Sequence, residues 1–184
     1  MFSTNIKMSF ELISKLAEPK FDLKRARLDA FKIIDDLKLP QIGLTHSKKE
    51  LSAHEKILES TGSIIDRETN TFKFKETDFT EFNEAYKNTY LYEIYKQLPN
   101  IGRFRIMTMF GPSCYTIHND MTRRYHFVLE TNIDCLFLFP RKKLQFHIPA
   151  DGNLYLLDTR FKHTFLNGSK DRRVHLVLDD LSTL

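Results

Sequence analysis

Hydrophobic positions in the first hundred residues recur mostly three or four apart, which is the spacing of an amphipathic helix. This pattern predicts helices over residues 21–37, 47–58 and 78–98, the first ending before Pro40. In the first helix the spacing selects one face: Leu23, Ala26, Leu28, Phe31, Ile34 and Leu37. Residues 71–75 alternate between polar and apolar and predict a short strand.

The pattern changes near residue 100, where short strand-like runs replace the helical spacing. Eight runs are separated by turn-forming residues: 103–109, 115–118, 124–131, 135–139, 144–148, 153–158, 162–166 and 173–178. Eight short strands about ten residues apart are typical of a double-sheet or closed β architecture. We therefore predict an α+β fold in one domain over residues 1–184. Residues 101–184 would form a double-stranded β-helix (a cupin-like jelly roll), and residues 1–100 a mainly helical support.

Composition and charge narrow the class of protein. Hydrophobic residues make up 41% and charged residues 28% of the chain, so a packed core is expected. No apolar run is long enough to span a bilayer, and the start lacks a secretory pattern, which predicts a cytoplasmic protein away from membranes. Cys114 and Cys135 are too few for a disulfide framework or a Cys-x-x-Cys metal site, and we expect free thiols buried near strands.

The positive charge lies in the second half of the chain. Residues 1–100 carry 16 Lys and Arg against 16 Asp and Glu, whereas residues 101–184 carry 12 against 8. This excess, to which Arg103 and Arg105 contribute, favours an anionic ligand. Basic and aromatic residues do not interleave on one element, so a nucleic-acid partner is not expected.

The most informative local pattern is His118-Asn119-Asp120. Residues two apart on a strand point to the same face, so an imidazole and a carboxylate can converge there. They are two of the three ligands of a 2-His-1-carboxylate site, which suits Fe(II). The alternative is a strand end with a solvated aspartate. A second histidine, His163, follows a Gly-led apolar strand and Asp158.

The ordered set of motifs over about residues 101–180 resembles the aspartyl/asparaginyl β-hydroxylase-like family of Fe(II)- and 2-oxoglutarate-dependent dioxygenases. The matching parts follow in order: His118-x-Asp120, Arg124-Tyr125-His126, Leu157-Asp158 where the family has Phe-Asp, His163, and the terminal strand from Arg173 to Asp179. Residues 1–100 show no comparable motif.

The resemblance implies a function and a set of site residues. Fe(II) would be held by His118, Asp120 and His163, the catalytic centre. Arg173 would bind the far carboxylate of 2-oxoglutarate through paired hydrogen bonds. By strand parity three further side chains share these inward faces and are candidates for the co-substrate pocket: Arg124, His126 and His175. The implied reaction uses O₂ and releases succinate and CO₂ while hydroxylating an unactivated C–H bond.

Several alternatives stay open at this point. Arg124 and Arg173 could be exposed strand arginines, and His126 and His175 could be core histidines. The chain could be a catalytically silent cupin-like binding or structural module, or a cupin-type metalloenzyme that uses zinc or nickel. The prime substrate could be an amino-acid side chain in a protein or peptide, a free amino acid or a small metabolite, with the charge favouring an anionic one. The oligomeric state is not predicted.

Overall fold

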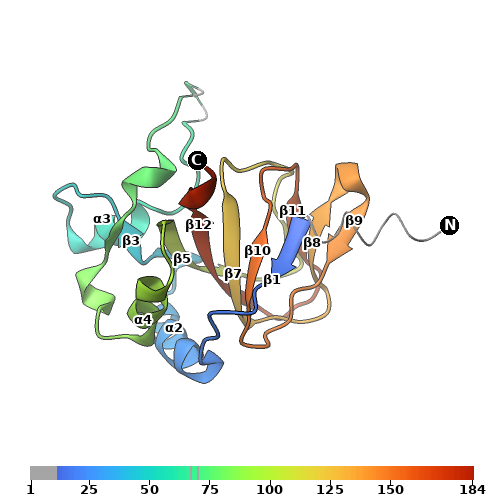
Figure 1. Ribbon diagram of the computed structural model, residues 1–184, viewed down its shortest axis with the longest axis horizontal. Coiled ribbons are helices and arrows are strands. Elements are labelled where there is room, and N and C mark those ends of the chain that lie inside the picture. The colour runs from blue at the N-terminus through green and yellow to red at the C-terminus, as the bar shows by residue number, and fades with distance from the viewer. Residues whose placement is uncertain (1–11, 67, 70) are drawn as a thin grey trace.

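Antiparallel β-sheets dominate the computed structural model, and a few helices pack beside them (Figure 1). The structure describes residues 12–66, 68–69 and 71–184. The expectation of a start without a secretory signal concerns residues 1–11 and lies outside the described residues.

Within these residues the strands form two larger sheets and one small one, and all neighbouring strands are antiparallel. The major sheet has the order β1 (Ile13–Lys15), β10 (Leu154–Leu157), β7 (Arg123–Glu130), β12 (Arg173–Asp180), β5 (Ile101–Met109) and β2 (Gln41–Gly43). The minor sheet has the order β6 (Ser113–Cys114), β11 (Thr164–Asn167), β8 (Cys135–Phe139) and β9 (Leu144–Phe146). The small sheet pairs β3 (Thr45–His46) with β4 (Glu81–Phe82).

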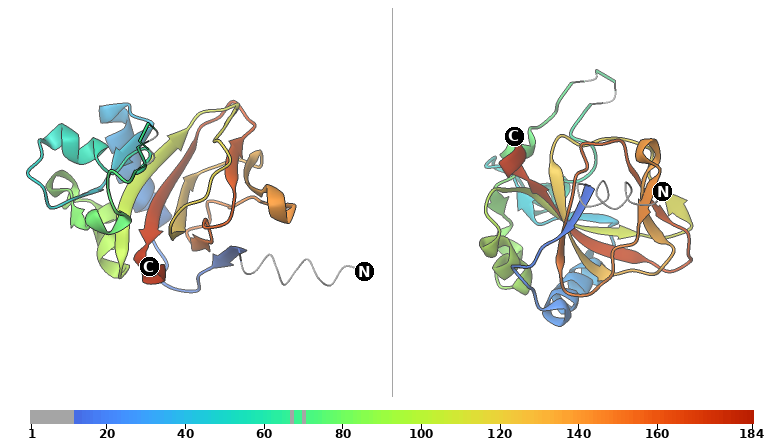
Figure 2. Two further views of the ribbon diagram at one scale, coloured as in Figure 1. Left: turned by 90° about the horizontal axis from the view of Figure 1, so that it is seen from above. Right: turned by 45° about the vertical axis from the view of Figure 1, so that its right-hand side comes forward.

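Three helices gather on the side of the major sheet away from the minor sheet (Figures 1 and 2). They are α2 (Leu23–Leu37), α3 (Ala53–Leu58) and α4 (Tyr90–Gln97). Short 3₁₀ turns complete the elements: η1 (Glu76–Asp78), η2 (Glu84–Tyr86), η3 (Pro140–Lys142) and η4 (Leu181–Thr183). Helix α2 begins where the Asp22 carboxylate accepts hydrogen bonds from two backbone N–H groups, and it ends at Lys38 in a left-handed conformation.

The helix predicted over residues 78–98 was wrong in its first half. The chain there forms η1, β4 and η2 before α4 begins at Tyr90. Phe79 and Phe82 are buried, but from irregular and extended backbone, so their spacing mimicked a helical face. The Asn83 side chain accepts a hydrogen bond from the Ala85 N–H and thereby favours a local turn over a continuous helix.

Other expected elements are shorter than predicted. The helix expected over 47–58 starts only after Ser52, because Ser52 and Glu55 form a reciprocal capping box. The strand expected over 71–75 is reduced to one bridge between Ile65 and Phe72. The strand expected over 115–118 is replaced by β6, two residues earlier, and a single bridge further on. Of the two thiols, Cys135 is buried as expected, whereas Cys114 is exposed.

Side-chain alternation on the major sheet separates two cores. Phe104, Phe127 and Leu176 point to the helices and join the first apolar cluster. A second cluster fills the space between the two sheets, with Phe137 of β8 and Phe165 of β11 among its members. The inward positions of β5, β7 and β12 also carry buried Arg and His side chains. The strand period therefore directs the ionisable residues of this sheet into the space between the sheets.

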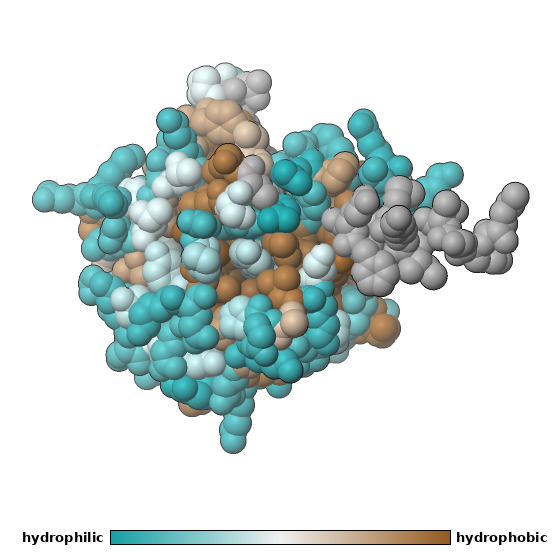
Figure 3. Space-filling model, in the orientation of Figure 1, coloured by the Kyte–Doolittle hydropathy of each residue, from teal (hydrophilic) through white to brown (hydrophobic). Residues whose placement is uncertain are grey.

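On the face shown in Figure 3, hydrophilic side chains surround a central area of apolar ones. Among the described residues no helix is both long and apolar enough to cross a bilayer.

Substitutions at two aliphatic side chains of α2 test the packing of the first apolar cluster. Ile34 is 7% exposed and packs in the cluster, whereas Leu28 is 73% exposed despite its place in the predicted helical face. We expect Ile34→Ala to lower the free energy of unfolding by about 2–5 kcal/mol, because it leaves a cavity. Leu28→Ala should change it by less than about 0.5 kcal/mol. Chemical denaturation measures both, and equal losses would contradict this packing.

Candidate metal centre and its pocket

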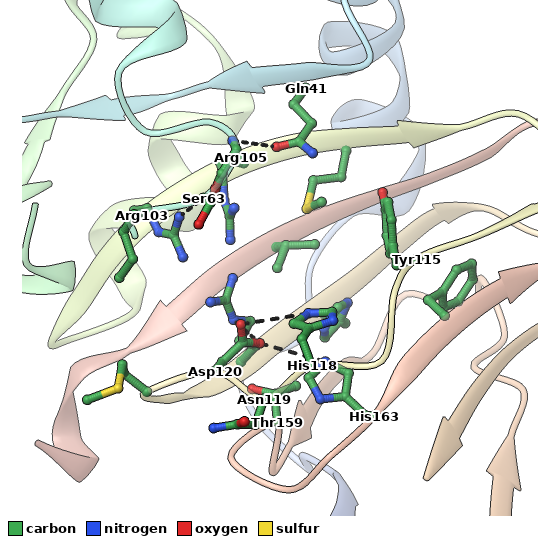
Figure 4. Close-up of a pocket in the computed structure, with 18 of the residues that line it drawn as sticks. Gln41, Ser63, Arg103, Arg105, Tyr115, His118, Asn119, Asp120, Thr159 and His163 are labelled. Carbon is green, nitrogen blue, oxygen red and sulfur yellow. Dashed lines mark hydrogen bonds and ion pairs between the residues drawn. The ribbon is translucent and has the colours of Figure 1, made fainter. Parts of the chain in front are cut away.

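The side chains of His118, Asp120 and His163 converge at one point between the sheets (Figure 4). One Asp120 oxygen lies 3.9 Å from His118 Nε2, and the other lies 3.7 Å from His163 Nε2. Ligands about 2 Å from a shared transition-metal ion are separated by distances of this order. The structure therefore brings these three side chains together.

The backbone aligns the two histidines. His118 and His163 form an isolated antiparallel bridge, with reciprocal N–H to C=O hydrogen bonds of 3.0 and 2.8 Å. Each ring also uses Nδ1 locally: His118 Nδ1 lies 2.7 Å from the Thr116 carbonyl and His163 Nδ1 lies 2.9 Å from the Phe161 carbonyl. A carbonyl only accepts, so both Nδ1 atoms carry the proton. The Nε2 lone pairs are left free to bind a metal.

Asp120 is fixed by its backbone and by Arg124. Its N–H donates to the Thr159 carbonyl at 2.9 Å, and one carboxylate oxygen forms an ion pair with Arg124 Nε at 2.8 Å. Burial lowers the pKa of the His163 imidazole, which favours the neutral, metal-binding form.

Arg124 belongs to a buried network of three arginines and three carboxylates. Besides Asp120, its guanidinium pairs with Asp179 at 3.1 Å and with Glu76 at 3.2 Å. Arg103 pairs with the same Asp179 at 2.8 Å and with Glu76 at 3.4 Å. Arg105 is the third arginine and reaches Asp179 at 3.4 Å. Figure 4 shows Arg103 and Arg105 on the wall of the pocket across from Asp120.

The network shifts the pKa values of its members in opposite directions. Burial alone would lower the pKa of Arg124, but the surrounding carboxylates more than offset this and raise it. Burial alone would raise the pKa of Asp179, but the three arginines lower it. Burial and the neighbouring arginines lower the pKa of Arg105 to about 9. Burial and Asp179 raise the pKa of Glu76. Arg124 and Asp179 are thus firmly ionised, whereas the charges of Arg105 and Glu76 are poorly compensated.

A separate buried cation, Arg173, lies on β12. It is 2% exposed, stacks over the Phe165 ring at 4.0 Å and donates to His175 Nδ1. Among the described residues no carboxylate pairs with it, and its Nε has no hydrogen-bond partner. Burial lowers its pKa to about 10. Such a guanidinium is ready to accept a carboxylate from a ligand.

The two inward histidines beside Arg173 are neutral. Burial and the charge of Arg173 lower the pKa values of His126 and His175 well below the usual range. Their Nδ1 atoms lie 3.3 Å apart, and neither Nε2 atom has a hydrogen-bond partner within the described part of the chain. His126 lines the pocket, whereas His175 lies behind the lining and contacts Arg173.

Apart from Asp179 and His175, these groups line one cavity of about 470 Å³. Its apolar wall includes Phe137, Phe165 and Met107, close to Arg173. Its remaining wall includes Gln41, residues 62–65, Glu76, Arg103 and Arg105. A cavity of this size accommodates small molecules.

The predicted site residues therefore lie together, with one difference in their surroundings. Arg124 faces inward as predicted, but three carboxylates engage its guanidinium. Arg172, one residue before Arg173, instead points outward to Glu130 at 3.1 Å, as parity requires.

Part of the pocket was not predicted from the sequence. Arg103 and Arg105 were counted only as unassigned cations, although their alternation on one strand could have placed both inward. No local sequence pattern indicated that Glu76 belongs to the pocket, because it reaches the pocket from η1 through a long-range contact.

Comparison with known proteins identifies the family of this chain. Residues 45–182 match the family model described as aspartyl/asparaginyl beta-hydroxylase. No curated protein matches the sequence of this chain. Among solved structures, a viral collagen prolyl hydroxylase of Paramecium bursaria Chlorella virus-1, in complex with 2-oxoglutarate, is similar at 10% identity and a TM-score of 0.46. That similarity covers 91% of this chain and 96% of the viral chain.

The family model covers about three quarters of the chain, including every strand from β3 to β12 and all the pocket's ionisable residues. The chain therefore belongs to the aspartyl/asparaginyl β-hydroxylase family of 2-oxoglutarate-dependent hydroxylases.

Proposed function

We propose that this protein hydroxylates an unactivated C–H bond of an amino-acid side chain or a related small molecule, with Fe(II) as metal and 2-oxoglutarate and O₂ as co-substrates. One observation carries the proposal. Two histidine Nε2 atoms and a carboxylate converge in the same cavity as a buried arginine that no described carboxylate neutralises.

The donor set fits iron. Two neutral imidazoles and one carboxylate, supplied by His118, His163 and Asp120, are the ligands of the 2-His-1-carboxylate class and leave coordination positions open. Iron bound there would supply the O₂ chemistry that converts 2-oxoglutarate to succinate and CO₂ and the substrate C–H to C–OH. The chain's own residues bind, orient and desolvate the reactants.

Arg173 is the proposed partner of the far carboxylate of 2-oxoglutarate. Its unpaired Nε and its stacking on Phe165 favour a planar carboxylate held in a fixed orientation. Neutral His126 and His175 add no competing charge, and the hydrogen bond from Arg173 to His175 restricts the guanidinium.

Arg124 is better assigned to Asp120 than to the co-substrate. Its Nε pairs with one Asp120 oxygen, while its other nitrogens pair with Asp179 and Glu76. This arrangement supports a role as a positioning residue that sets the orientation of the ligand carboxylate.

The strand order supports the jelly-roll assignment that accompanies this function. From β5 onward, successive strands alternate between the sheets except at the β8–β9 hairpin, so that β10-β7-β12-β5 faces β6-β11-β8-β9. We propose that these eight strands form the double-stranded β-helix, with β1 and β2 as additions at the edges of the major sheet.

The metal assignment predicts a selective loss of iron. His163→Ala and His118→Ala each remove one ligand, so Fe(II) affinity should fall by more than about 100-fold. His147→Ala is the matched control, because that ring contacts the Cys135 carbonyl and does not line the cavity. Anaerobic Fe(II) titration with metal analysis measures the effect. Normal iron stoichiometry in His163→Ala would contradict the assignment.

The co-substrate assignment predicts different outcomes for two adjacent arginines. Arg173→Gln should weaken 2-oxoglutarate binding by about 10–100-fold while iron binding is preserved, since a charge-assisted bond is lost. The Arg172→Gln variant should bind 2-oxoglutarate with normal affinity, because Arg172 pairs with Glu130 outside the pocket. Anaerobic calorimetry with 2-oxoglutarate measures both affinities. Equal losses would mean that Arg173 does not bind the co-substrate.

A further inference from the structure

Part of the surface carries positive charge that no acidic residue of the same segments offsets. Residues 135–150 and 159–170 contain six Lys and Arg side chains and no Asp or Glu. These segments form β8, η3, β9 and β11 and the loop that precedes β11. Arg160 is neutralised by Asp158 at 2.7 Å, whereas the other five cations have no ion-pair partner among the described residues. The positive charge of the chain is therefore concentrated on the minor sheet.

Four of these cations gather on two loops that touch each other. Arg141, Lys142 and Lys143 lie in and directly after η3, which joins β8 to β9 at the right of Figure 1. Lys162 lies on the loop before β11. The two loops meet where the Lys142 ammonium lies over the Phe161 ring, 4.7 Å from the ring centroid. All five side chains are exposed, and we call them the basic patch.

The basic patch borders the candidate metal centre. The η3 turn begins directly after Phe139, whose ring lies against that of His163 with 5.8 Å between the centroids. On the other loop, the Phe161 carbonyl accepts a hydrogen bond from His163 Nδ1, and the Thr159 carbonyl accepts one from the Asp120 N–H. A molecule bound on the basic patch therefore contacts the loop that orients two of the three candidate ligands.

The basic patch also offers an apolar contact between its charges. Phe161 is 41% exposed, and Lys142 and Lys162 flank it, one over its ring and the other as its neighbour in the chain. Cations that have no carboxylate close by repel one another, so an anionic group bound among them is stabilised. The basic patch is thus suited to a ligand that carries several negative charges around an apolar group.

From these contacts we propose that the basic patch is a docking surface for an acidic segment of a partner protein. Carboxylates of that segment bind the four cations, and an apolar side chain between them packs on Phe161. The inference goes beyond the proposed function, because it concerns the surface outside the cavity and does not name the group that enters the cavity. Electrostatic attraction of this kind speeds association and fixes the register of the partner.

The geometry favours a polypeptide over the other polyanions. A single-stranded nucleic acid binds through aromatic faces on which its bases stack, but Lys142 lies over the exposed Phe161 ring. A membrane surface needs an apolar face several residues wide, whereas the basic patch consists of two short loops with one large apolar side chain. A narrow acidic segment can pair with the cations of both loops and contact Phe161 between them.

Fluorescence anisotropy with labelled peptides tests the requirement for charge. The probe is a peptide of three Glu-Glu-Leu-Gly repeats, and its control has Gln in place of every Glu. At low salt we expect the Glu peptide to bind the wild-type protein at least about tenfold more tightly than the Gln peptide. The difference should largely disappear at high salt, because the screening length falls from about 10 Å at 0.1 M to about 3 Å at 1 M.

Two double variants with the same loss of charge test the location. Lys142→Gln with Lys162→Gln removes one cation from each loop and should weaken binding of the Glu peptide by about fivefold or more. Lys24→Gln with Lys32→Gln is the matched control, because both side chains are exposed on α2, and it should stay within about twofold of wild type. Acetylation of lysines in the wild-type protein gives an independent map. The bound peptide should protect Lys142 and Lys162 but not Lys24.

Several results would overturn the inference. These are no binding of the Glu peptide, equal binding of the Glu and Gln peptides, or equal losses in the two double variants. Tighter binding of an oligodeoxynucleotide or of phosphatidylserine vesicles, lost in the Lys142 and Lys162 variant and not displaced by the peptide, would assign the basic patch to that other partner. The measurements contain no metal and no 2-oxoglutarate, so a failure here leaves the proposed function unaffected, and a lack of 2-oxoglutarate turnover leaves the docking surface unaffected.

Discussion

The neutralisation of buried charge between the two sheets is the constraint on which the pocket depends. Asp179 is fully buried and pairs with Arg103, Arg105 and Arg124, each of which comes from an inward position on the major sheet. Isolated charges at such depth would be too costly, so these groups must remain together. Arg124 then orients the Asp120 carboxylate through an ion pair, and this carboxylate lies beside both histidines. The orientation of the candidate metal ligands is thus a consequence of the ion pairs behind them.

The first half of the chain completes the pocket as well as covering the sheet. Its helices bury the outer face of the major sheet, while β2 extends that sheet beside β5. Glu76 and residues 62–65 reach the cavity from this half and form part of its wall. Closure of the pocket therefore requires contacts between residues far apart in the sequence, such as Glu76 with Arg124.

The alternation of side chains along a strand explains which features of the site could be predicted from the sequence. The strand period placed Arg124 with His126 and Arg173 with His175, and it separated Arg172 from Arg173, because alternation depends only on local backbone geometry. His118 and Asp120 also converge, although the backbone there forms only a bridge at His118 and no strand at Asp120. The helix over 78–98 was wrong because buried aromatic residues such as Phe79 can reach a core from irregular backbone. The role of Glu76 and the triple engagement of Asp179 could not be predicted, since they arise from tertiary contacts that leave no local pattern.

The central claim is that the His118, Asp120 and His163 cluster and Arg173 together support Fe(II)-dependent turnover of 2-oxoglutarate. The most direct measurement is the release of succinate and CO₂ from 2-oxoglutarate by purified protein supplied with Fe(II), ascorbate and O₂. The account predicts equal amounts of both products, formed only when Fe(II) and O₂ are present and abolished by chelation of the metal. Turnover that persists without metal, or no turnover by protein that binds both Fe(II) and 2-oxoglutarate even when a panel of amino acids is supplied, would contradict it.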